Sequence, residues 1–224
     1  MKGEITLKFK ILLIITILSV LTCLVMAGNM PHLVGLNFMT GEKPTCIIVA
    51  DFNRDKIFDL AITNEKNNNV SVLLGNGDNT FQPQRTFGVG EEPSAVIAGD
   101  FDRDGNGDLA VTNRGSNDVT ILLGTGDGYF QKAATYQVGE QPVSLTGGDF
   151  NKDMIIDLAV ANYKSNNISI LAGNGDGSFQ NAGTVGIGKG PISLGVGDFN
   201  QDFLIDLVSV NNKSNNVSVF INEP

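Results

Sequence analysis

Short apolar stretches alternate with polar turns along most of the chain, and the whole pattern returns every 49 residues. One stretch in each period alternates apolar and polar residues, as in VSVLL from Val70 and VTILL from Val119. This period of two indicates a β-strand with one face more buried than the other. Other short stretches end in Asn, begin at Phe-Gln or follow a proline. The pattern therefore predicts four strands per unit and an all-β fold, with no stretch of helical period.

Four repeats of this length are typical of a solenoid or a β-propeller. The chain lacks the polar caps that an open solenoid requires, so we predict a β-propeller of four repeats of about 49 residues. Counting back from Phe81 places the segment His32–Pro44 where a Phe-Gln strand would stand, and the last unit stops before its own Phe-Gln strand. We expect the N-terminal segment to supply the outer strand of the fourth blade, because ring closure removes free sheet edges.

The first 27 residues do not belong to the repeat. Lys2, Lys8 and Lys10 precede an uncharged apolar run from Ile11 to Met26, and small or aliphatic residues lead up to Ala27. This three-part pattern predicts a secretory signal peptide over residues 1–27 and a propeller domain over residues 28–224. The run is shorter than the roughly 20 residues of a spanning helix, although an uncleaved membrane anchor is the alternative. We expect a secreted or cell-surface protein.

The formal net charge is −9, and removing residues 1–27, which carry three Lys and one Glu, would change it to −11. Such an acidic domain is a poor candidate for binding nucleic acid or anionic membranes, whereas cations and positively charged partners suit it. Cys46 would be its only cysteine, which excludes an internal disulfide and favours a small buried residue.

A ten-residue acidic string begins each unit, and it reads DFNRDKIFDL, DFDRDGNGDL, DFNKDMIIDL and DFNQDFLIDL from Asp51, Asp100, Asp149 and Asp198. Oxygen-bearing side chains stand at positions 1, 3, 5 and 9. Calcium takes such oxygen ligands from alternate positions of a loop. In the second unit the predicted ligands are Asp100, Asp102, Asp104, the backbone carbonyl of Asn106, and Asp108.

Two positions, counted from the first Asp of each string and running two residues past its end, define the kind of site. Position 12 is Val111 rather than the Glu of a helical calcium loop, so the loop must join two strands. Position 6 normally takes Gly for a left-handed bend. Gly105 provides it in the second unit, whereas the other units have Lys56, Met154 and Phe203. The second site is therefore the strongest calcium candidate, and the alternative is a set of acidic turns without metal.

Repulsion among the clustered carboxylates favours a cation at one site or more. The Phe at position 2 of each string is predicted to pack between neighbouring sheets; these residues are Phe52, Phe101, Phe150 and Phe199.

Catalysis finds little support in the repeat. His32 is the only histidine, Cys46 has no histidine partner in the pattern, and every pair of carboxylates belongs to a repeated loop. We therefore predict that the protein is not an enzyme.

The string DFNxDxxxDLAVxN, followed by SNNVSVLLGNGDGxFQ, resembles the FG-GAP and VCBS repeats of integrin α-chains and bacterial secreted proteins. The resemblance implies a calcium-binding β-propeller involved in binding or cell adhesion, whose family members commonly have seven blades. A four-bladed ring, an arc that pairs with a second chain as a homodimer, and an incomplete propeller all remain open. By analogy the remaining metal ligands are Asp51, Asn53, Asp55 and Asp59; Asp149, Asn151, Asp153 and Asp157; and Asp198, Asn200, Asp202 and Asp206.

We expect a binding or adhesion module for a protein or carbohydrate ligand. The alternative is a propeller lectin with sugar sites between blades, where Tyr129 and Tyr163 could stack on sugars. A hydrolase on a propeller scaffold is the third reading, and it lacks an asymmetric polar constellation.

Overall fold

The computed structural model describes residues 35–223. The chain separates into two units, Met1–Asn37 and Phe38–Pro224, and the described strands all belong to the second unit. The predicted signal peptide lies outside the described residues. Among residues 35–223, none belongs to a helix of the length and apolarity that crossing a bilayer requires.

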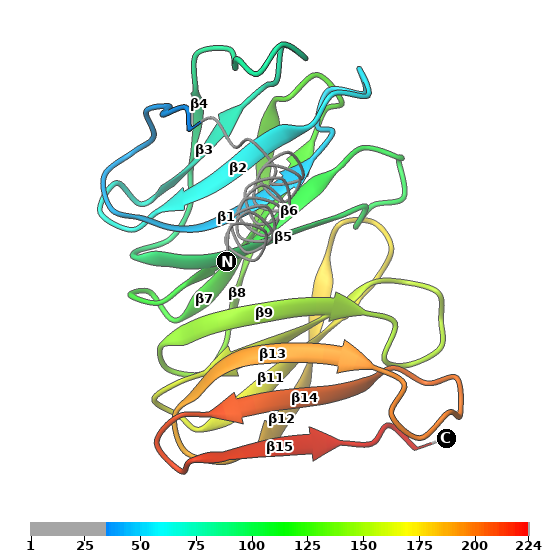
Figure 1. Cartoon of the computed structure of the whole chain (residues 1–224). Coiled ribbons are helices and arrows are strands. Elements are labelled where there is room, and N and C mark those ends of the chain that lie inside the picture. Colours follow the sequence, from blue (N-terminus) through cyan, green and yellow to red (C-terminus); the bar gives the residue numbers. More distant parts are fainter. Residues whose placement is uncertain (1–34, 224) are drawn as a thin grey trace, which may run out of the picture. The chain divides into compact units, whose positions relative to one another are not determined.

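The second unit consists of antiparallel sheets that follow one another as the blades of a propeller (Figure 1). Within each blade the strands are neighbours in sequence order. Blade 1 contains β1 (Pro44–Ala50), β2 (Asp59–Asn64), β3 (Asn69–Leu73) and β4 (Arg85–Gly88); blade 2 contains β5 (Pro93–Gly99), β6 (Asp108–Asn113), β7 (Asp118–Gly124) and β8 (Phe130–Gln137); blade 3 contains β9 (Pro142–Gly148), β10 (Asp157–Asn162), β11 (Asn167–Gly173) and β12 (Phe179–Gly186); blade 4 contains β13 (Pro191–Gly197), β14 (Asp206–Asn211) and β15 (Asn216–Phe220). The prediction of an all-β propeller built from four repeats is confirmed.

The inner strand of each blade contacts the inner strand of the next, in the order β1, β5, β9 and β13. Each inner strand begins at a proline, which has no N–H to donate and is tolerated at the first residue of a strand. These prolines are Pro44, Pro93, Pro142 and Pro191. The repeat therefore builds a row of blades with the same edge of every sheet at its inner side.

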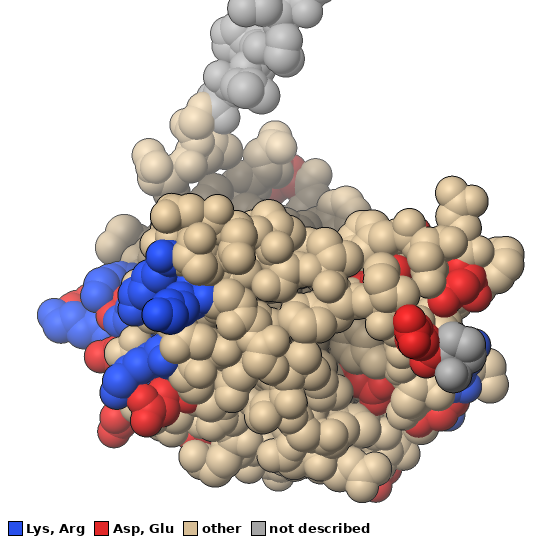
Figure 2. Space-filling view, turned by 90° about the horizontal axis from the view of Figure 1, so that it is seen from below, with Lys and Arg blue, Asp and Glu red and all other residues tan. Residues whose placement is uncertain are grey.

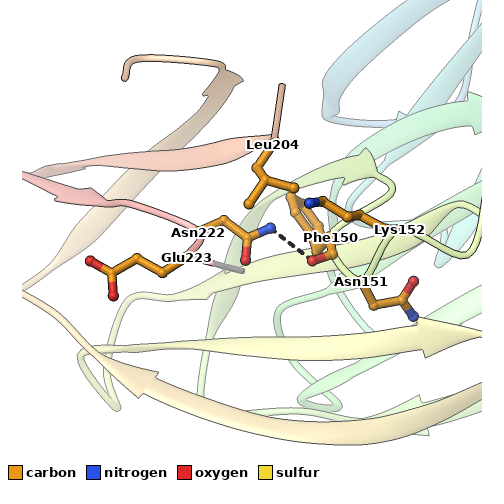
Figure 3. Close-up of a pocket in the computed structure, with 6 residues that line it drawn as sticks. All are labelled: Phe150, Asn151, Lys152, Leu204, Asn222 and Glu223. Atoms are coloured by element: carbon orange, nitrogen blue, oxygen red, sulfur yellow. Dashed lines mark hydrogen bonds between the residues drawn. The ribbon is translucent and has the colours of Figure 1, made fainter. Parts of the chain in front are cut away.

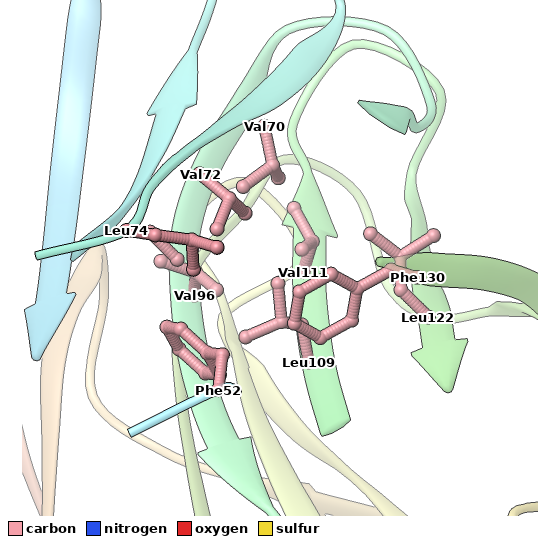
Figure 4. Packing of buried hydrophobic residues seen from close by; sticks show 10 residues of the cluster. Phe52, Val70, Val72, Leu74, Val96, Leu109, Val111, Leu122 and Phe130 are labelled. Carbon is pink, nitrogen blue, oxygen red and sulfur yellow. The ribbon is translucent and has the colours of Figure 1, made fainter. Parts of the chain in front are cut away.

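The apolar core lies between the blades. Between blades 1 and 2, Val70 and Val72 face Leu109 and Val111, and all four side chains are fully buried (Figure 4). Equivalent clusters lie between blades 2 and 3 and between blades 3 and 4. Cys46 packs against the first cluster as a partly buried side chain. Blades 2 and 3 consequently bury both faces of their sheets, which explains why their second strands have no exposed position.

The Phe at position 2 of the acidic string belongs to this packing. Phe52 meets Phe130 of the next blade edge to face, with ring centroids 5.4 Å apart, and Phe101 meets Phe179 at 5.6 Å. The prediction is confirmed for these residues, whereas Phe199 in blade 4 is 52% exposed. In residues 35–223 no fifth blade follows to cover it.

One strand starts later than the repeat predicts. In blade 1 the Phe-Gln segment forms only an isolated bridge between Gly75 and Phe81, and β4 begins at Arg85. Pro83 stands where Lys132 pairs with Leu122 in blade 2. Because proline has no N–H for the ladder, the pairing is interrupted there.

The expected closure of blade 4 by the N-terminal segment is wrong for the residues described. Blade 4 has three strands, and the described part of the segment packs on blade 1 instead. Phe38 contacts Phe81, and Lys43 forms an ion pair with Glu65, with 2.6 Å between Nζ and Oε1. The N–H of Glu65 also donates to the carbonyl of Lys43 at 2.9 Å. These contacts hold the segment at the opposite end of the row from blade 4.

Candidate metal centre

The acidic loops join the first strand of each blade to the second, and their position 9 has a structural role. Asp59 accepts a hydrogen bond from the backbone N–H of Phe52 and another from that of Gly75, both at 2.8 Å. Asp108, Asp157 and Asp206 make the same pair of bonds, the last with Asn222 in place of the glycine. Each of these carboxylates is buried. Position 9 therefore ties the start of the loop to the end of the third strand, in addition to any part it takes in metal binding.

All four loops adopt the same left-handed bend at position 6, including the three loops that lack Gly there. Gly105 has a φ of 81°, and the L-residues at this position have φ values of 69° for Lys56, 64° for Met154 and 67° for Phe203. A Cβ in this region costs roughly 1 kcal/mol. Met154 and Phe203 are 86% and 94% exposed, so their side chains gain no compensating burial.

Three of the loops are closed by an internal amide. In the first loop the side-chain amide of Asn53 donates to Asp55 Oδ2 at 2.8 Å, and the N–H of Asp55 donates to Asp51 Oδ1 at 3.2 Å. The third and fourth loops repeat both bonds with Asn151 and Asn200 as the amide donors. In these loops the side-chain amide at position 3 satisfies one oxygen of the carboxylate at position 5, and the backbone N–H of position 5 satisfies Oδ1 of the carboxylate at position 1.

The second loop lacks a donor at position 3, which is Asp102, and the side-chain amide of Asn106 donates to Asp104 Oδ2 instead, at 2.6 Å. The carboxylate of Asp102 can only accept, and it receives the N–H of Asp104 at 3.1 Å. Oδ1 of Asp100 is buried and has no hydrogen-bond partner. Oxygen atoms of Asp100, Asp102 and Asp108 all lie within 4.8 Å of one another. The structure therefore brings together three of the predicted ligands of this loop and leaves one buried oxygen unsatisfied.

The pKa values within the second loop reflect this crowding. Burial raises the pKa of Asp108 to about 6, and the nearby carboxylates of Asp102 and Asp104 act in the same direction. Burial also raises the pKa of Asp102, whereas the backbone N–H of Asn106 lowers that of Asp104. A cation would lower the free-energy cost of keeping Asp108 and Asp102 ionised.

This donor set fits calcium. Calcium takes six to eight oxygen ligands in flexible geometry, and a buried carboxylate oxygen without a partner is available for it. Asp100, Asp102 and Asp108 would hold the ion and neutralise its charge.

One predicted ligand of this loop, Asp104, is already engaged by a neighbouring residue. The carboxylate of Asp104 accepts from the N–H and the side-chain amide of Asn106, at 2.7 and 2.6 Å. The side-chain oxygen of Asn106 is buried without a partner, although sequence reasoning considered only its backbone carbonyl. Metal binding stays a prediction at all four loops.

A second set of buried polar residues has a structural role that the sequence analysis did not predict. The Asn that ends each second strand is buried and donates its amide to side chains at the start of the third strand. Asn113, for example, bonds Asp118 Oδ1 at 2.6 Å and Thr120 Oγ1 at 2.9 Å. The recurrence of Asn at the end of every LAxxN stretch was the available signal. These residues brace the edge of the blades opposite the acidic loops.

The tyrosines considered for sugar stacking already carry cations. The guanidinium of Arg85 lies 4.2 Å from the ring centroid of Tyr129, and the ammonium of Lys213 lies 4.1 Å from that of Tyr163. One face of each ring is therefore covered by a cation–π contact.

Blades of antiparallel strands with an acidic loop between the first two strands define a β-propeller repeat protein. A family model described as "FG-GAP-like repeat" matches residues 51–111 and 149–209, more than half of the chain. The chain belongs to this family. No curated protein matches the chain.

Solved structures share the fold at low sequence identity. BBS1N in complex with ARL6DN is 14% identical, with a TM-score of 0.56, and the match covers 83% of this chain and 58% of that one. A protein from Lactobacillus plantarum is 12% identical, with a TM-score of 0.57 and coverages of 84% and 58%. A catalytically inactive virginiamycin B lyase from Staphylococcus aureus with quinupristin is 17% identical, with a TM-score of 0.51 and coverages of 83% and 58%. This chain thus spans less than two thirds of each of these structures.

Proposed function

We propose that this protein is an exported, calcium-stabilised β-propeller that acts as a binding or adhesion module for a protein or glycan ligand, without catalytic activity. The observation that carries the calcium assignment is the second acidic loop. There the internal amide of the other loops is replaced by Asp102, and a buried oxygen of Asp100 lacks a partner. A cation at this point would occupy the place of the backbone N–H that Oδ1 of the first Asp accepts in the other three loops.

Calcium in this loop would act on stability. The three carboxylates come from the two ends of the loop, and Asp108 is the residue that also ties the loop to the third strand. An ion that binds only the folded arrangement adds its binding free energy to the free energy of unfolding. The blade junction beside the loop, where Phe101 packs on Phe179, would be stabilised with it.

The calcium assignment is tested by thermal unfolding of the full chain in calcium and in a chelator, together with isothermal titration calorimetry. We expect a higher melting temperature in calcium, and a titration with at least one site per chain. Magnesium is the matched control, because it demands a stricter octahedral geometry than this loop provides. An unchanged melting temperature together with a flat calorimetric trace would refute the assignment.

A binding role rather than catalysis is supported by how the carboxylates are used. Asp59, Asp108, Asp157 and Asp206 all accept backbone N–H groups at equivalent places, so the buried carboxylates serve the architecture of the repeat. The fold neighbours include a propeller solved in complex with another protein, BBS1N with ARL6DN. This neighbour supports a protein ligand as one of the two classes.

The ligand class is tested with a glycan array and a panel of purified extracellular proteins, each in calcium and in chelator. A calcium-dependent signal on the protein panel identifies an adhesion module. A signal confined to the glycan array identifies the lectin alternative. Turnover of ester or glycoside substrates by the purified chain would overturn the proposal of a non-enzymatic protein.

A further inference from the structure

The outer face of blade 4 repeats an interface that is buried everywhere else. Val217 is 56% exposed, whereas its equivalents Val70, Val119 and Ile168 have no exposed surface. Val219 is 53% exposed, and its equivalents Val72 and Ile121 are also fully buried. Seen from the β15 end of the molecule, this face is a broad uncharged area with charged side chains gathered at its two sides (Figure 2). The outer face of blade 4 therefore has the apolar residues of a junction between two blades, but no neighbouring blade covers it in the described part of the chain.

Blade 1 presents the complementary half of such a junction. Ile47 on β1 is 57% exposed, although its equivalents Val96 and Leu145 are 2% and 7% exposed in blades 2 and 3. In every internal junction, the face that blade 4 leaves open packs against the face that blade 1 leaves open. The open face of blade 4 and the open face of blade 1 are therefore complementary, because the same two faces pack together at each internal junction.

Phe38 shows that blade 1 already carries part of a preceding blade. Its ring packs edge to face on Phe81, with centroids 5.0 Å apart and an interplanar angle of 77°. Phe87 has the same relationship to Phe130, at 5.3 Å and 73°, and Tyr136 has it to Phe179, at 5.8 Å and 77°. Phe87 and Tyr136 lie in outer strands, and Phe38 precedes Phe87 by the repeat length of 49 residues. Phe38 thus occupies the outer-strand position of a blade that would stand before blade 1.

Blade 4 lacks that outer strand. The edge of β15 has no partner strand in the described part of the chain, whereas β3, β7 and β11 each pair with an outer strand. A cavity of about 320 Å³ lies beside Phe150 and Leu204. The side-chain amide of Asn222 donates there to the carbonyl of Phe150 at 2.8 Å (Figure 3). In the earlier junctions the equivalent carbonyls receive the N–H of Gly128 and Gly177, which come from the turn before the outer strand.

We propose that blade 4 of one copy of this chain packs against blade 1 of a second copy, whose Phe38 segment lies along β15 as the missing outer strand. The internal register defines the pairing, because Val70 pairs with Phe87 and Val119 with Tyr136. The same register places Val217 opposite Phe38 of the second copy.

Two copies can satisfy both ends at once. The described part of each chain has one open blade 4 face and one open blade 1 face, so a two-fold arrangement would form two identical junctions and pair the open edge of β15 in both copies. The ring would have eight blades, four from each copy, at the upper end of the usual range. A segment such as that of Phe38, which extends from one copy to complete a sheet of the other, adds strand pairing to the apolar contact.

The first test is the mass of the full chain by size-exclusion chromatography with light scattering. We expect twice the chain mass at micromolar concentration. Val219→Asp should shift the mass to that of a single chain, because it places a carboxylate in the apolar junction. Phe203→Asp is the matched control, since Phe203 lies in the same blade but is 94% exposed on the acidic loop, and it should leave the mass unchanged. A single-chain mass for the unmodified protein, or a ladder of growing masses, would overturn the closed dimer.

The second test uses a disulfide at the predicted pair. Phe38→Cys and Val217→Cys are combined in a Cys23→Ser, Cys46→Ser background and oxidised, because opposite positions of an antiparallel pair lie close enough for a bridge. We expect a covalent dimer on a non-reducing gel, and none with either cysteine alone. A bridge that forms within one chain, giving a compact monomer, would instead show that the four blades close on themselves. Absence of any bridge in a chain that elutes as a dimer would overturn the proposed register.

Discussion

The side-chain amide of Asn53 donates a hydrogen bond to Asp55 Oδ2 at 2.8 Å, and the equivalent pair in the second loop, Asp102 and Asp104, cannot make it. In the second loop the side-chain amide of Asn106 bonds Asp104 instead, and Oδ1 of Asp100 is left buried without a partner. The repeat therefore offers an internal comparison: three loops in which the amide at position 3 bonds the carboxylate at position 5, and one in which position 3 is itself a carboxylate.

Asp102→Asn should convert the second loop into a copy of the others. The new amide can donate to Asp104, and one carboxylate is removed from the triad with Asp100 and Asp108. We expect the melting temperature in chelator to rise and the calcium-dependent increase to shrink or vanish. Calorimetry should show at least a tenfold weaker calcium affinity at this loop, equivalent to about 1.4 kcal/mol. Unchanged calcium affinity in this variant would contradict the assignment of the site.

The reverse change is expected to have the opposite effect. Asn53→Asp removes the internal donor of the first loop and adds a fourth carboxylate beside Asp51, Asp55 and Asp59. We expect a lower melting temperature in chelator that calcium restores in part. Asn76→Asp is a suitable control, because Asn76 lies on an exposed turn and its amide bonds only Thr80. Equal responses of both variants to calcium would show a general charge effect instead.

Asp157→Ala should destabilise the protein whether or not calcium is present. The carboxylate accepts the buried N–H groups of Phe150 and Gly173, at 2.9 Å each. Each buried donor left without a partner costs roughly 1–3 kcal/mol, so the expected loss in the free energy of unfolding is about 2–5 kcal/mol. Glu140→Ala, at an exposed ion pair with Lys164, should change it by less than about 0.5 kcal/mol. Urea unfolding with both variants measures the difference.

The stability of the calcium-free protein should increase as the pH falls from about 7 toward 5. The folded state raises the pKa of Asp108 to about 6 from an ordinary value of 3.8, so it binds this proton more tightly than the unfolded chain does. The resulting stabilisation is complete below the unfolded pKa and is lost as the pH rises through about 6. Glu65, whose pKa is lowered by its hydrogen bond with Lys43, titrates below this window.

Calcium should reverse this pH trend, because protons and calcium compete for the same carboxylates. Urea unfolding between pH 5 and 7, in chelator and in calcium, provides the comparison. Parallel pH profiles in the two solutions would mean that Asp108 does not contribute to ion binding.

Phe101→Ala should open a cavity in the junction between blades 2 and 3. The ring is 2% exposed and packs edge to face on Phe179. Truncation of a buried Phe costs about 3–5 kcal/mol. Phe203→Ala, at a ring that is 94% exposed, should cost little and is the control for the loss of an aromatic side chain. Similar melting temperatures for the two variants would contradict the assigned core.

Most of the fold was predictable because the sequence pattern of each strand recurs in successive repeats. The alternating stretches from Val70 and Val119 became β3 and β7, and the acidic strings became the loops before β2 and β6. Local pattern is sufficient here, because each blade forms from strands that are neighbours in the sequence. The late start of β4 also has a local cause, Pro83.

The candidate site was predicted only in outline. The string located the carboxylates, and Gly105 singled out the second loop. It did not show that Asp108 has both oxygens on backbone N–H groups, or that the side-chain amide of Asn53 bonds Asp55 within its own loop. Hydrogen-bond partners depend on how the loop folds over the third strand, and residue spacing does not encode that.

The sequence by itself determined the all-β propeller, the repeat of four blades and the position of the acidic loops, because strand periodicity and turn chemistry are local properties. Only the tertiary structure decided which oxygens remain free, and that Phe38 packs on Phe81 of blade 1 instead of completing blade 4. Both depend on contacts between segments far apart in the chain. The physical reason is that similar repeats have similar local preferences. Only the packing between segments determines which polar groups find hydrogen-bond partners and which strand edges are paired.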